Sequence, residues 1–363
     1  MPRQFDIAVI GAGSWGTALA CSLVRGGSSV VLWGRDAASM AAMATRGSNE
    51  RYLPGHRLPA GLAFESDFEG ALSSAFGILL ALPSHAFAGA CVSLQSALDS
   101  AATGARFSEG GAPEAASLPP AGVLWAGKGL DGAGGRFLHE VAAENLPPDT
   151  PFGLLSGPTF AKEVAQGLPC AATLASARAS FIDWWAGHLS APRFRIYPST
   201  DLIGVQIAGA VKNVLAIAAG ISDGLAFGAN ARAALIARGL QEMSRLGEAA
   251  GATAATFAGL AGLGDLVLTC TDDQSRNRRF GLALAQGSKA SASIRERRGP
   301  DGQVIEGIAA ATLTCRLARE LGVEMPICEQ VRAVVAQEIE PLDAVQALLA
   351  RDRAGAEAQS EGA

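Results

Sequence analysis

FDIAVIGAGSWGTALACSLV, residues 5–24, is the stretch of the sequence that decides the fold. It begins with an apolar run that predicts a buried strand, and it ends with the pattern of a helix. Between the two lie Gly11, Gly13 and Gly16, in the spacing GxGxxG. A strand, a glycine-rich turn and a helix in this order predict the first unit of a dinucleotide-binding fold.

Each glycine of this turn suits a contact with the pyrophosphate of NAD or NADP. Gly11 permits the tight turn, Gly13 lets the backbone approach the phosphates, and Gly16 lets the helix pack closely on the strand. The helix that follows offers free N–H groups and the positive end of its dipole, which favour an anion. Ser14 and Trp15 lie at this helix start, so we expect them beside the phosphates.

The end of the second strand bears on the choice of cofactor. Residues 30–33 predict that strand, and Gly34-Arg35-Asp36 follows it. An acid at this place accepts hydrogen bonds from a free ribose hydroxyl, whereas an arginine accommodates the 2′-phosphate of NADP. Because Arg35 comes first, the sequence favours NADP. Asp36 leaves NAD open, as does the alternative that Arg35 is a solvated surface residue.

Length and charge limit the classes of protein. A chain of 363 residues predicts two domains. With 29 Lys and Arg against 34 Asp and Glu, the net charge is −5, which argues against nucleic acid or an anionic membrane as the main partner. The six cysteines form no CxxC pair and the four histidines lack the short spacings of metal sites, so we expect reduced thiols and no structural metal.

The first residues pass directly into a strand pattern without the features of a signal peptide, which predicts a cytoplasmic protein. The longest stretch without formal charge, residues 71–98, is interrupted by Pro83, His85 and Gln95. We therefore expect no membrane span.

Seven short apolar runs alternate with helical patterns up to residue 198. Several of them are apolar throughout, as is typical of strands covered on both faces by helices. The runs are 7–10, 30–33, 78–82, 123–126, 152–155, 171–174 and 194–197. They predict an α/β Rossmann-type fold with a parallel, doubly wound sheet over residues 1–198.

Residues 199–350 have an Ala-rich helical pattern, which predicts an all-α C-terminal domain. The clearest helical segments are 202–219, 230–251, 305–321 and 326–337. Residues 100–120 are rich in Gly, Ala, Ser and Pro and predict a mobile loop. A similar composition predicts a disordered tail over 351–363.

Lys212 and Asn213 interrupt a predicted helix that is otherwise apolar on every face. Burial disfavours the ammonium form of a lysine and lowers its pKa toward the range of a general acid or base. Lys212 is therefore a candidate proton donor, unless its side chain extends past the edge of the core into solvent.

Further polar groups follow in the same half of the chain. Asp265 lies in a glycine-rich, otherwise apolar segment, where a buried carboxylate needs a partner. Residues 275–279, SRNRR, then collect hydroxyl, guanidinium and amide donors at a predicted helix start. Such donors suit a phosphate ester, although a solvated basic patch would have the same sequence.

Five runs of the sequence resemble those of bacterial-type NAD(P)-dependent glycerol-3-phosphate dehydrogenases. They are GAGSWGTALA from residue 11, LSGPTFAKEVAQGLP from 155, AGAVKNVLAIAAGISDGL from 208, GANARAALIARGL from 228 and GLAGLGDLVLTCTDDQSRNRRFG from 259. The resemblance covers nearly the whole chain except the tail and the region around 100–120, where this sequence is longer than the family pattern.

The resemblance implies roles for the polar positions of these runs. The implied catalytic residues are Lys212, Lys128 and Asp265, with Lys212 as the general acid and base. The implied substrate contacts are Lys128, Gly157, Thr159, Lys212, Asp265, Ser275, Arg276 and Asn277. The implied cofactor contacts are Gly11, Gly13, Ser14, Trp15, Gly16, Arg35, Lys128, Ala161, Arg276, Val304 and Glu306. Local sequence alone would equally allow a helix-capping role for Glu306 and a plain turn at 156–158.

The same resemblance implies reversible hydride transfer between NAD(P)H and dihydroxyacetone phosphate, giving sn-glycerol 3-phosphate for phospholipid synthesis in a homodimer. A related dehydrogenase of a carboxylated hydroxy acid is the alternative among enzymes, with the basic run binding a carboxylate. A catalytically silent NADP sensor is the alternative from another class, but it would not need a lysine on an apolar helix.

Overall fold

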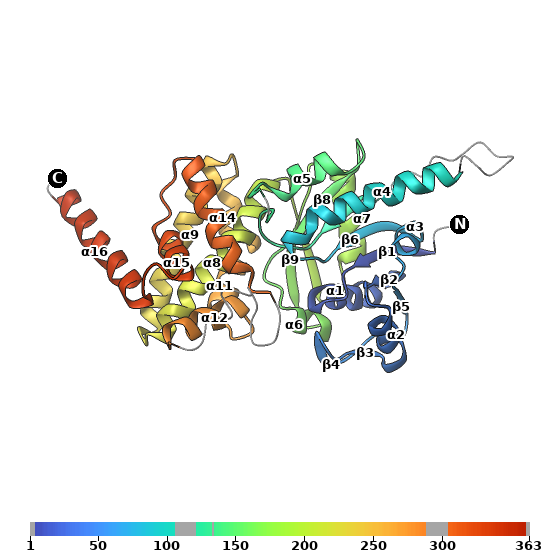
Figure 1. Ribbon diagram of the computed structural model, residues 1–363, viewed down its shortest axis with the longest axis horizontal. Coiled ribbons are helices and arrows are strands. Elements are labelled where there is room, and N and C mark those ends of the chain that lie inside the picture. Colours follow the sequence, from blue (N-terminus) through green and yellow to red (C-terminus); the bar gives the residue numbers. More distant parts are fainter. Residues whose placement is uncertain (1–3, 106–120, 133, 288–303, 361–363) are drawn as a thin grey trace. The chain divides into compact units, whose positions relative to one another are not determined.

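Two compact units, residues 1–202 and 203–363, make up the chain, where the sequence predicts domains of 1–198 and 199–350. The computed structural model describes residues 4–105, 121–132, 134–287 and 304–360. The first unit holds the sheet, and the second is built of helices (Figure 1).

The first unit contains an eight-stranded sheet in the order β10-β9-β8-β7-β6-β1-β2-β5. Its strands are β1 (Phe5–Ile10), β2 (Val30–Trp33), β5 (Leu62–Glu65), β6 (Ala75–Leu80), β7 (Val123–Trp125), β8 (Phe152–Ser156), β9 (Cys170–Ala175) and β10 (Phe194–Ser199). All seven predicted strands are present, within a few residues of the expected limits. The order reverses after β1, because β2 lies on one side of it and β6 on the other.

The sheet is mainly parallel, as predicted, with one antiparallel strand pair. The six neighbouring strands β8, β7, β6, β1, β2 and β5 are parallel to one another. Strands β9 and β10 are also parallel to each other, but β9 runs antiparallel to β8. The chain between β8 and β9 contains the six-residue helix α6 (Ala161–Gln166), which packs against α1 (Ser14–Arg25). Since this connection does not return the chain to the opposite edge of the sheet, β9 starts near the end of β8.

Three short strands were not predicted from the sequence. Two of them, β3 (Ser48–Asn49) and β4 (Leu53–Arg57), form an antiparallel hairpin, and the third is β5. Most residues of β4 are exposed, and β5 has only four residues. Neither strand therefore has the apolar run that marks a buried strand in a sequence.

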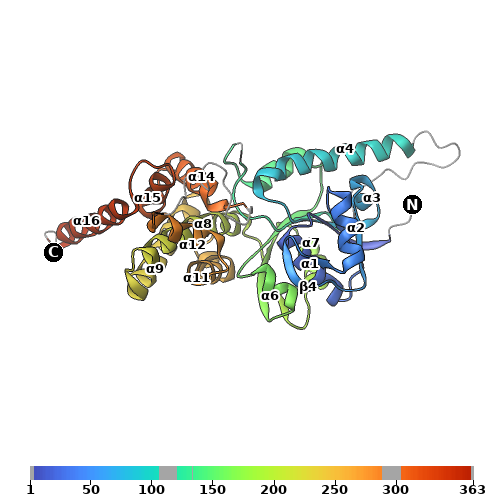
Figure 2. The ribbon, with the colours of Figure 1, turned by 60° about the horizontal axis from the view of Figure 1, so that its bottom comes forward.

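Helices cover both faces of the sheet. Figure 2 shows α4 (Phe87–Ala105) on one side and α1, α6 and α7 (Ala179–Leu189) on the other. The remaining helical segments of this unit are α2 (Ala37–Arg46), α3 (Phe68–Ser73), the 3₁₀ turn η1 (Ser84–Ala86) and α5 (Leu138–Asn145). Ile7, Leu19 and Trp185 belong to one hydrophobic cluster in which β1, α1 and α7 pack together. Burial of these apolar side chains fixes the place of α1 on the sheet.

The long helix α4 continues through Ala105, so the first part of the predicted 100–120 loop is helical. Alanine has the highest helix propensity, and Ala101, Ala102 and Ala105 extend the helix into a region whose overall composition suggested a loop. Residues 106–120 lie outside the described residues.

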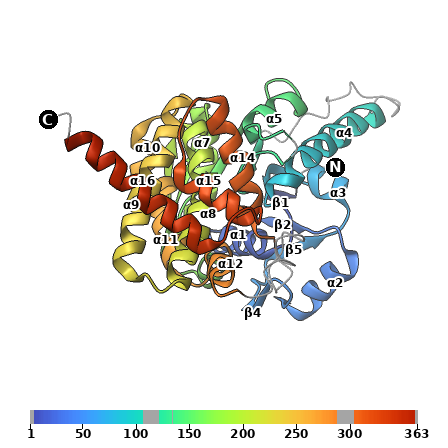
Figure 3. The same ribbon diagram turned by 60° about the vertical axis from the view of Figure 1, so that its left-hand side comes forward.

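The second unit is helical, as predicted from composition. Its elements are α8 (Leu202–Gly224), α9 (Gly228–Ala249), α10 (Ala254–Ala258), the π-helical turn η2 (Leu260–Gly264), α11 (Asp265–Thr271), α12 (Arg276–Ala285), α14 (Glu306–Glu320), α15 (Pro326–Val335) and α16 (Pro341–Ser360). Residues 204–222 of α8 are buried without interruption, and α9, α11, α12, α14 and α15 lie around it (Figure 3).

Helix α8 is the one described helix that is long and apolar enough to cross a membrane by length and composition. Of its most apolar segment, 89% is buried inside the protein. This degree of burial is typical of a core helix, which is apolar on every face just as a membrane-spanning helix is.

The prediction of a disordered tail is wrong for residues 351–360, which belong to α16. Alanine, arginine, glutamate and glutamine dominate this segment, and all of them favour a helix. Residues 361–363 of the predicted tail lie outside the described residues.

Candidate active site

The turn at Gly11, Gly13 and Gly16 has a separate steric reason for each glycine. Gly11 has a φ of +119°, and a Cβ there would lie 2.6 Å from the backbone oxygen of Ala81. A Cβ on Gly16 would clash with the backbone oxygen of Gly11. A Cβ on Gly13 would meet no described atom within 4 Å. The first and last glycines therefore build the turn, while the middle one borders open space that a ligand can enter.

Helix α1 begins directly at this turn and suits an anion. Its N-cap is Gly13, which has no side chain to accept a hydrogen bond from the first N–H groups, and its first turn has no acidic residue. These N–H groups and the positive end of the helix dipole favour a phosphate. The turn and the helix start together fit the pyrophosphate of a dinucleotide.

The side chains of Ser14 and Trp15 hold the turn in place. Ser14 Oγ donates to the backbone oxygen of Tyr52 (2.6 Å). Trp15 Nε1 donates to the backbone oxygen of Ala126 (3.2 Å), directly after β7. Their side chains therefore fasten the start of α1 to two loops, while their backbone N–H groups belong to the predicted phosphate contact.

Arg35 and Asp36 follow β2, and the structure gives them different surroundings. Asp36 is the N-cap of α2, and its carboxylate accepts hydrogen bonds from Ala38 N (3.1 Å), Ser39 N (3.2 Å) and Ser39 Oγ (2.8 Å). These bonds, the Ser39 hydroxyl first, lower the pKa of the Asp36 carboxyl below its ordinary value. Arg35 is exposed beside it. The carboxylate is therefore used by its own helix.

Lys128 and the loop after β8 form a second group in the sheet unit. Lys128 Nζ donates to the backbone oxygen of Gly157 (2.9 Å), and Thr159 Oγ1 donates to the same oxygen (3.2 Å). Gly157 has a φ of +144°, which disfavours any residue with a side chain. Ala161 starts α6 four residues further on. The structure thus brings together the predicted residues Lys128, Gly157 and Thr159.

Lys212 and Asp265 form an ion pair inside the helical unit. The Nζ–Oδ1 distance is 2.7 Å, and the side chains are 8% and 1% exposed. Thr269 Oγ1 accepts a second hydrogen bond from Lys212 Nζ (3.0 Å) and donates to the backbone oxygen of Asp265 (2.6 Å). The sequence predicted that Asp265 needs a partner if buried, and the partner is Lys212. The alternative that Lys212 reaches into solvent is wrong.

Thr269 was not predicted from the sequence as a partner of this pair. It lies one turn after Asp265 on α11, on the same helix face. A polar residue four positions from a buried carboxylate was the available signal.

A hydrogen-bond network around two asparagine side chains joins four further positions of the helical unit. Asn277 Nδ2 donates to Asn213 Oδ1 (2.9 Å), and Asn277 Oδ1 accepts from the backbone N–H of Gly307 (3.0 Å). Asn213 Nδ2 also lies 3.5 Å from Glu306 Oε2. The predicted residues Asn277 and Glu306 are therefore connected through Asn213, the neighbour of Lys212. Asn213 was noted in the sequence but not assigned to the site.

Residues 275–279 are not a uniformly solvated basic patch. Ser275 is the N-cap of α12, and its Oγ accepts from the backbone N–H of Arg278 (3.2 Å). Arg278 is buried and binds Asp223 through Nη2 (2.6 Å) and Nε (3.1 Å). Arg276 is half-buried at the first residue of α12, where an anion is favoured. Val304 is half-buried two residues before α14.

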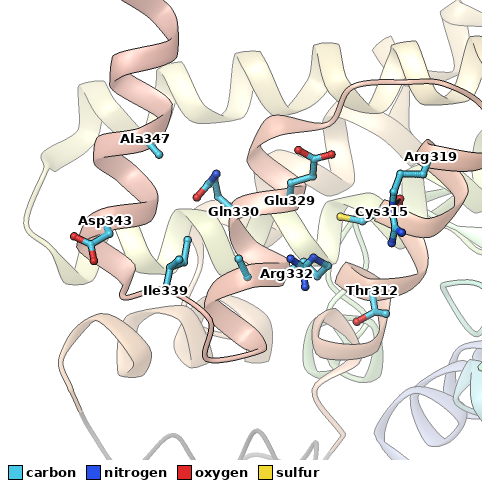
Figure 4. A pocket seen from close by; sticks show the side chains of 10 residues that line it. Thr312, Cys315, Arg319, Glu329, Gln330, Arg332, Ile339, Asp343 and Ala347 are labelled. Carbon is cyan, nitrogen blue, oxygen red and sulfur yellow. Dashed lines mark hydrogen bonds between the residues drawn. The ribbon is translucent and has the colours of Figure 1, made fainter.

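A cavity of about 800 Å³ lies elsewhere in the helical unit, among α14, α15 and the start of α16 (Figure 4). Its lining residues are Thr312, Cys315, Arg319, Glu329, Gln330, Arg332, Ala333, Ile339, Asp343 and Ala347. None of the predicted site residues lines it.

Cys270 follows Asp265 by five positions on α11, and its side chain is fully buried. Burial raises the pKa of its thiol to about 12, so the thiol stays protonated near neutral pH. Among the described residues, no group of three or more His, Cys, Asp or Glu side chains is arranged to hold a metal ion.

A Rossmann-type sheet with a glycine-rich turn between β1 and α1 is the arrangement that binds the dinucleotide in nicotinamide-dependent dehydrogenases. The family models described as NAD-dependent glycerol-3-phosphate dehydrogenase N-terminus and C-terminus match residues 6–182 and 201–346. The chain therefore belongs to the NAD-dependent glycerol-3-phosphate dehydrogenase family.

Curated relatives and a crystal structure agree with these matches. The chain is 49% identical over 354 residues to the glycerol-3-phosphate dehydrogenase (NAD(P)+) of Shewanella frigidimarina, covering 97% of this chain and 98% of that protein. It is 49% identical over 350 residues to the enzyme of the same name from Thioalkalivibrio sulfidiphilus, covering 96% and 98%. The crystal structure of glycerol-3-phosphate dehydrogenase from Coxiella burnetii aligns with a TM-score of 0.84 at 42% identity, covering 95% of this chain and 99% of that one.

Proposed function

We propose that the chain catalyses the reversible reduction of dihydroxyacetone phosphate to sn-glycerol 3-phosphate with NADH or NADPH, and supplies this product for phospholipid synthesis. The observation that carries the proposal is the buried Lys212–Asp265 pair, with 2.7 Å between nitrogen and oxygen. A nicotinamide-dependent reduction of a ketone needs one proton donor, and this pair provides one in the helical unit. Family membership supports the same reaction.

Lys212 exchanges the proton in this proposal. When bound, the reduced dinucleotide supplies a hydride to the carbonyl carbon. As negative charge develops on the carbonyl oxygen, this oxygen takes a proton from the ammonium group of Lys212. The products are a secondary alcohol and a neutral amine at Lys212. In the reverse direction the amine removes the hydroxyl proton. Asp265 and Thr269 hold Nζ by hydrogen bonds of 2.7 and 3.0 Å, so its position is set before the substrate binds.

The substrate contacts in this proposal follow the resemblance to the family. Arg276 suits the phosphate because it starts α12, whose dipole and N–H groups favour an anion. The substrate contacts that we propose are Lys128, Gly157, Thr159, Lys212, Asp265, Ser275, Arg276 and Asn277. Asn277 and Ser275 also support the backbone around them, through Asn213 and the N-cap of α12.

The glycine turn is the main cofactor site in this proposal. Its fit rests on the uncapped start of α1 and the open space beside Gly13. The proposed cofactor contacts are Gly11, Gly13, Ser14, Trp15, Gly16, Arg35, Lys128, Ala161, Arg276, Val304 and Glu306. Arg35 is exposed and the carboxylate of Asp36 is used by its own helix, which supports NADP as the preferred cofactor.

The decisive experiment follows NADPH absorbance after addition of dihydroxyacetone phosphate to the purified protein. We expect a loss of absorbance with the phosphate ester and a much smaller one with dihydroxyacetone. Absence of a loss over a range of pH would contradict the proposal. A loss only with carboxylated keto acids would favour the hydroxy-acid dehydrogenase, and NADP binding without any turnover would favour the sensor.

We further propose a cytoplasmic homodimer with no nucleic-acid partner. The net charge of −5 supports the last point, because nucleic acid requires a basic surface. The dimer rests on the resemblance to the family, and sedimentation of the purified protein tests it.

A further inference from the structure

The β3–β4 hairpin is fastened to the glycine turn by a buried amide. Asn49 is 3% exposed. Its Nδ2 donates to the backbone oxygen of Ala12 (3.0 Å) and to Thr17 Oγ1 (2.8 Å), and its Oδ1 accepts from the backbone N–H of Tyr52 (3.3 Å). A satisfied, buried amide of this kind fixes one conformation, because breaking its bonds would leave polar groups without partners.

A second link holds the same segment from the other side of the turn. The hydroxyl of Ser14, the first residue of α1, donates to the backbone oxygen of Tyr52. The segment from Asn49 to Tyr52 is therefore tied to the turn at both of its ends. Arg51 lies between the two attachments, so its backbone position relative to the predicted phosphate site is fixed.

The side chain of Arg51 is exposed, and its guanidinium carbon lies 5.1 Å from the centre of the Tyr52 ring. Stacking on an aromatic ring limits the directions in which a guanidinium extends. The pKa of the Asp36 carboxyl is lowered chiefly by hydrogen bonds from Ser39, and the charge of Arg51 contributes in the same direction. Ala12, which Asn49 binds, also lies against Gly34, directly before Arg35, so the hairpin segment that carries Arg51 borders the residues around Arg35.

The acid at this place already serves as the N-cap of α2. Asp36 accepts three hydrogen bonds from Ala38 and Ser39, at 3.1, 3.2 and 2.8 Å. The cap of α2 thus occupies most of the acceptor sites of this carboxylate. Arg35, the neighbour of Asp36 in the chain, and Arg51 are both exposed.

We propose that the β3–β4 hairpin completes the recognition of the 2′-phosphate of NADP, with Arg51 as the second guanidinium beside Arg35. The proposal rests on the proposed binding of the dinucleotide at the glycine turn. A phosphate monoester carries close to two negative charges at neutral pH, so two guanidiniums match it in charge and in hydrogen-bond geometry. The ribose of NAD presents a neutral hydroxyl at the same place and gains little from Arg51.

Isothermal titration of the complete protein tests this without any turnover. The titrants are NADP+ against NAD+, and 2′,5′-ADP against 5′-AMP, which isolate the 2′-phosphate. We expect Arg51→Ala to weaken NADP+ and 2′,5′-ADP by about tenfold, the loss of one charge-assisted contact, with NAD+ and 5′-AMP changed less than about twofold. The matched control is Arg57→Ala, which removes another exposed arginine from β4 of the same hairpin and should change neither pair.

Two results would overturn the inference: an unchanged affinity of Arg51→Ala for NADP+, or an equal loss for NADP+ and NAD+. Asn49→Ala gives the contrasting pattern, because release of the hairpin from the turn should weaken both dinucleotides. Failure of the proposed function is distinguishable, since the wild-type protein would then bind neither dinucleotide or would not consume NADPH with dihydroxyacetone phosphate.

Discussion

Lys212 is the residue at which burial and charge oppose each other most directly. An ammonium that is almost fully removed from water needs a nearby negative charge. Asp265 supplies it at 2.7 Å, and the hydroxyl of Thr269 accepts a further hydrogen bond. Buried pairs of this kind rarely add net stability, so their presence in a core favours a functional explanation.

The first prediction replaces Lys212 by alanine. Turnover of dihydroxyacetone phosphate should fall roughly 100- to 10,000-fold, the usual contribution of a general acid, while NADPH binding is largely retained. Steady-state kinetics and titration calorimetry measure the two quantities. Because the substitution leaves the carboxylate of Asp265 buried, the double variant Lys212→Ala/Asp265→Asn is the control. It should recover stability without recovering turnover, and near-normal turnover in either variant would make Lys212 a structural residue.

The glycines of the turn give a second prediction at the same scale. Gly13→Ala adds a methyl group to open space, so the protein should fold normally but bind NADP+ at least about tenfold more weakly, because the methyl group keeps the phosphates away. Gly16→Ala forces a backbone shift at Gly11 and should lower the free energy of unfolding by about 1–3 kcal/mol. Urea unfolding and dinucleotide titration separate the two effects, and identical profiles would contradict the assignment of separate roles.

Helix α12 depends on a contact with the end of α8. Asp223, near the end of α8, binds Arg278 of α12 and Arg232 of α9, with nitrogen–oxygen distances of 2.6 and 2.9 Å. The side chains of Asp223 and Arg278 are both 10% exposed. Arg278 also donates its backbone N–H to Ser275. This ion-pair cluster therefore positions the start of α12, where the proposed phosphate contacts lie.

The third prediction concerns Asp223→Asn, which removes the charge but keeps the shape. The free energy of unfolding should fall by about 3 kcal/mol, the lower end of the range for a broken buried pair, because Arg278 keeps its contact with Asp273. If Asp223 also positions the start of α12, the KM for dihydroxyacetone phosphate should rise more than the KM for NADPH. Equal changes in both constants would reduce Asp223 to a purely structural residue.

Sequence alone predicted those elements whose burial leaves a pattern. The apolar runs of β1, β2 and β6 and the uniformly apolar α8 could be read because both faces of each are covered. The hairpin and β5 left no such pattern. The antiparallel β9 could not be predicted, since the direction of a strand depends on where its connection packs and not on its own residues.

The candidate site shows the same limit. Lys212 and Asp265 each stood out as a charge in an apolar segment, but their pairing spans 53 positions of the chain and follows from the packing of α8 and α11. Asn213 and Asn277 meet across 64 positions. The roles of Thr269 and Asn213 could not be predicted in the same way, because neutral polar residues are common in helices. Their burial costs much less free energy than the burial of a charge.

At the scale of the whole molecule, each unit has a hydrophobic interior of its own. The sheet unit buries β1, α1 and α7 in one cluster, and the helical unit buries nearly all of α8. A unit with its own interior can unfold as a cooperative whole. The six cysteines provide labels for both, since Cys21, Cys91 and Cys170 belong to the first unit and Cys270, Cys315 and Cys328 to the second.

The last prediction uses these thiols. Five of the six are buried, and Cys170 is partly exposed. Burial raises the pKa to about 11 for Cys21, Cys170 and Cys315, to about 12 for Cys91 and Cys270, and well above the ordinary value for Cys328. Because the thiolate is the reactive form, the folded protein should react slowly with a maleimide near neutral pH, first at Cys170.

Increasing urea should then release the buried thiols in two groups, one for each unit, as followed by mass spectrometry of the labelled peptides. NADP+ binds only the folded protein, so at a concentration one hundred times its Kd it should raise the free energy of unfolding of the first unit by about 2.7 kcal/mol. Labelling of Cys21 and Cys91 should then require a higher urea concentration. The matched control is 5′-AMP at the same concentration, which should delay labelling less. Simultaneous release of all five buried thiols would show that the two units unfold as one, and rapid labelling of Cys270 in the folded protein would contradict its placement in the core beside Lys212.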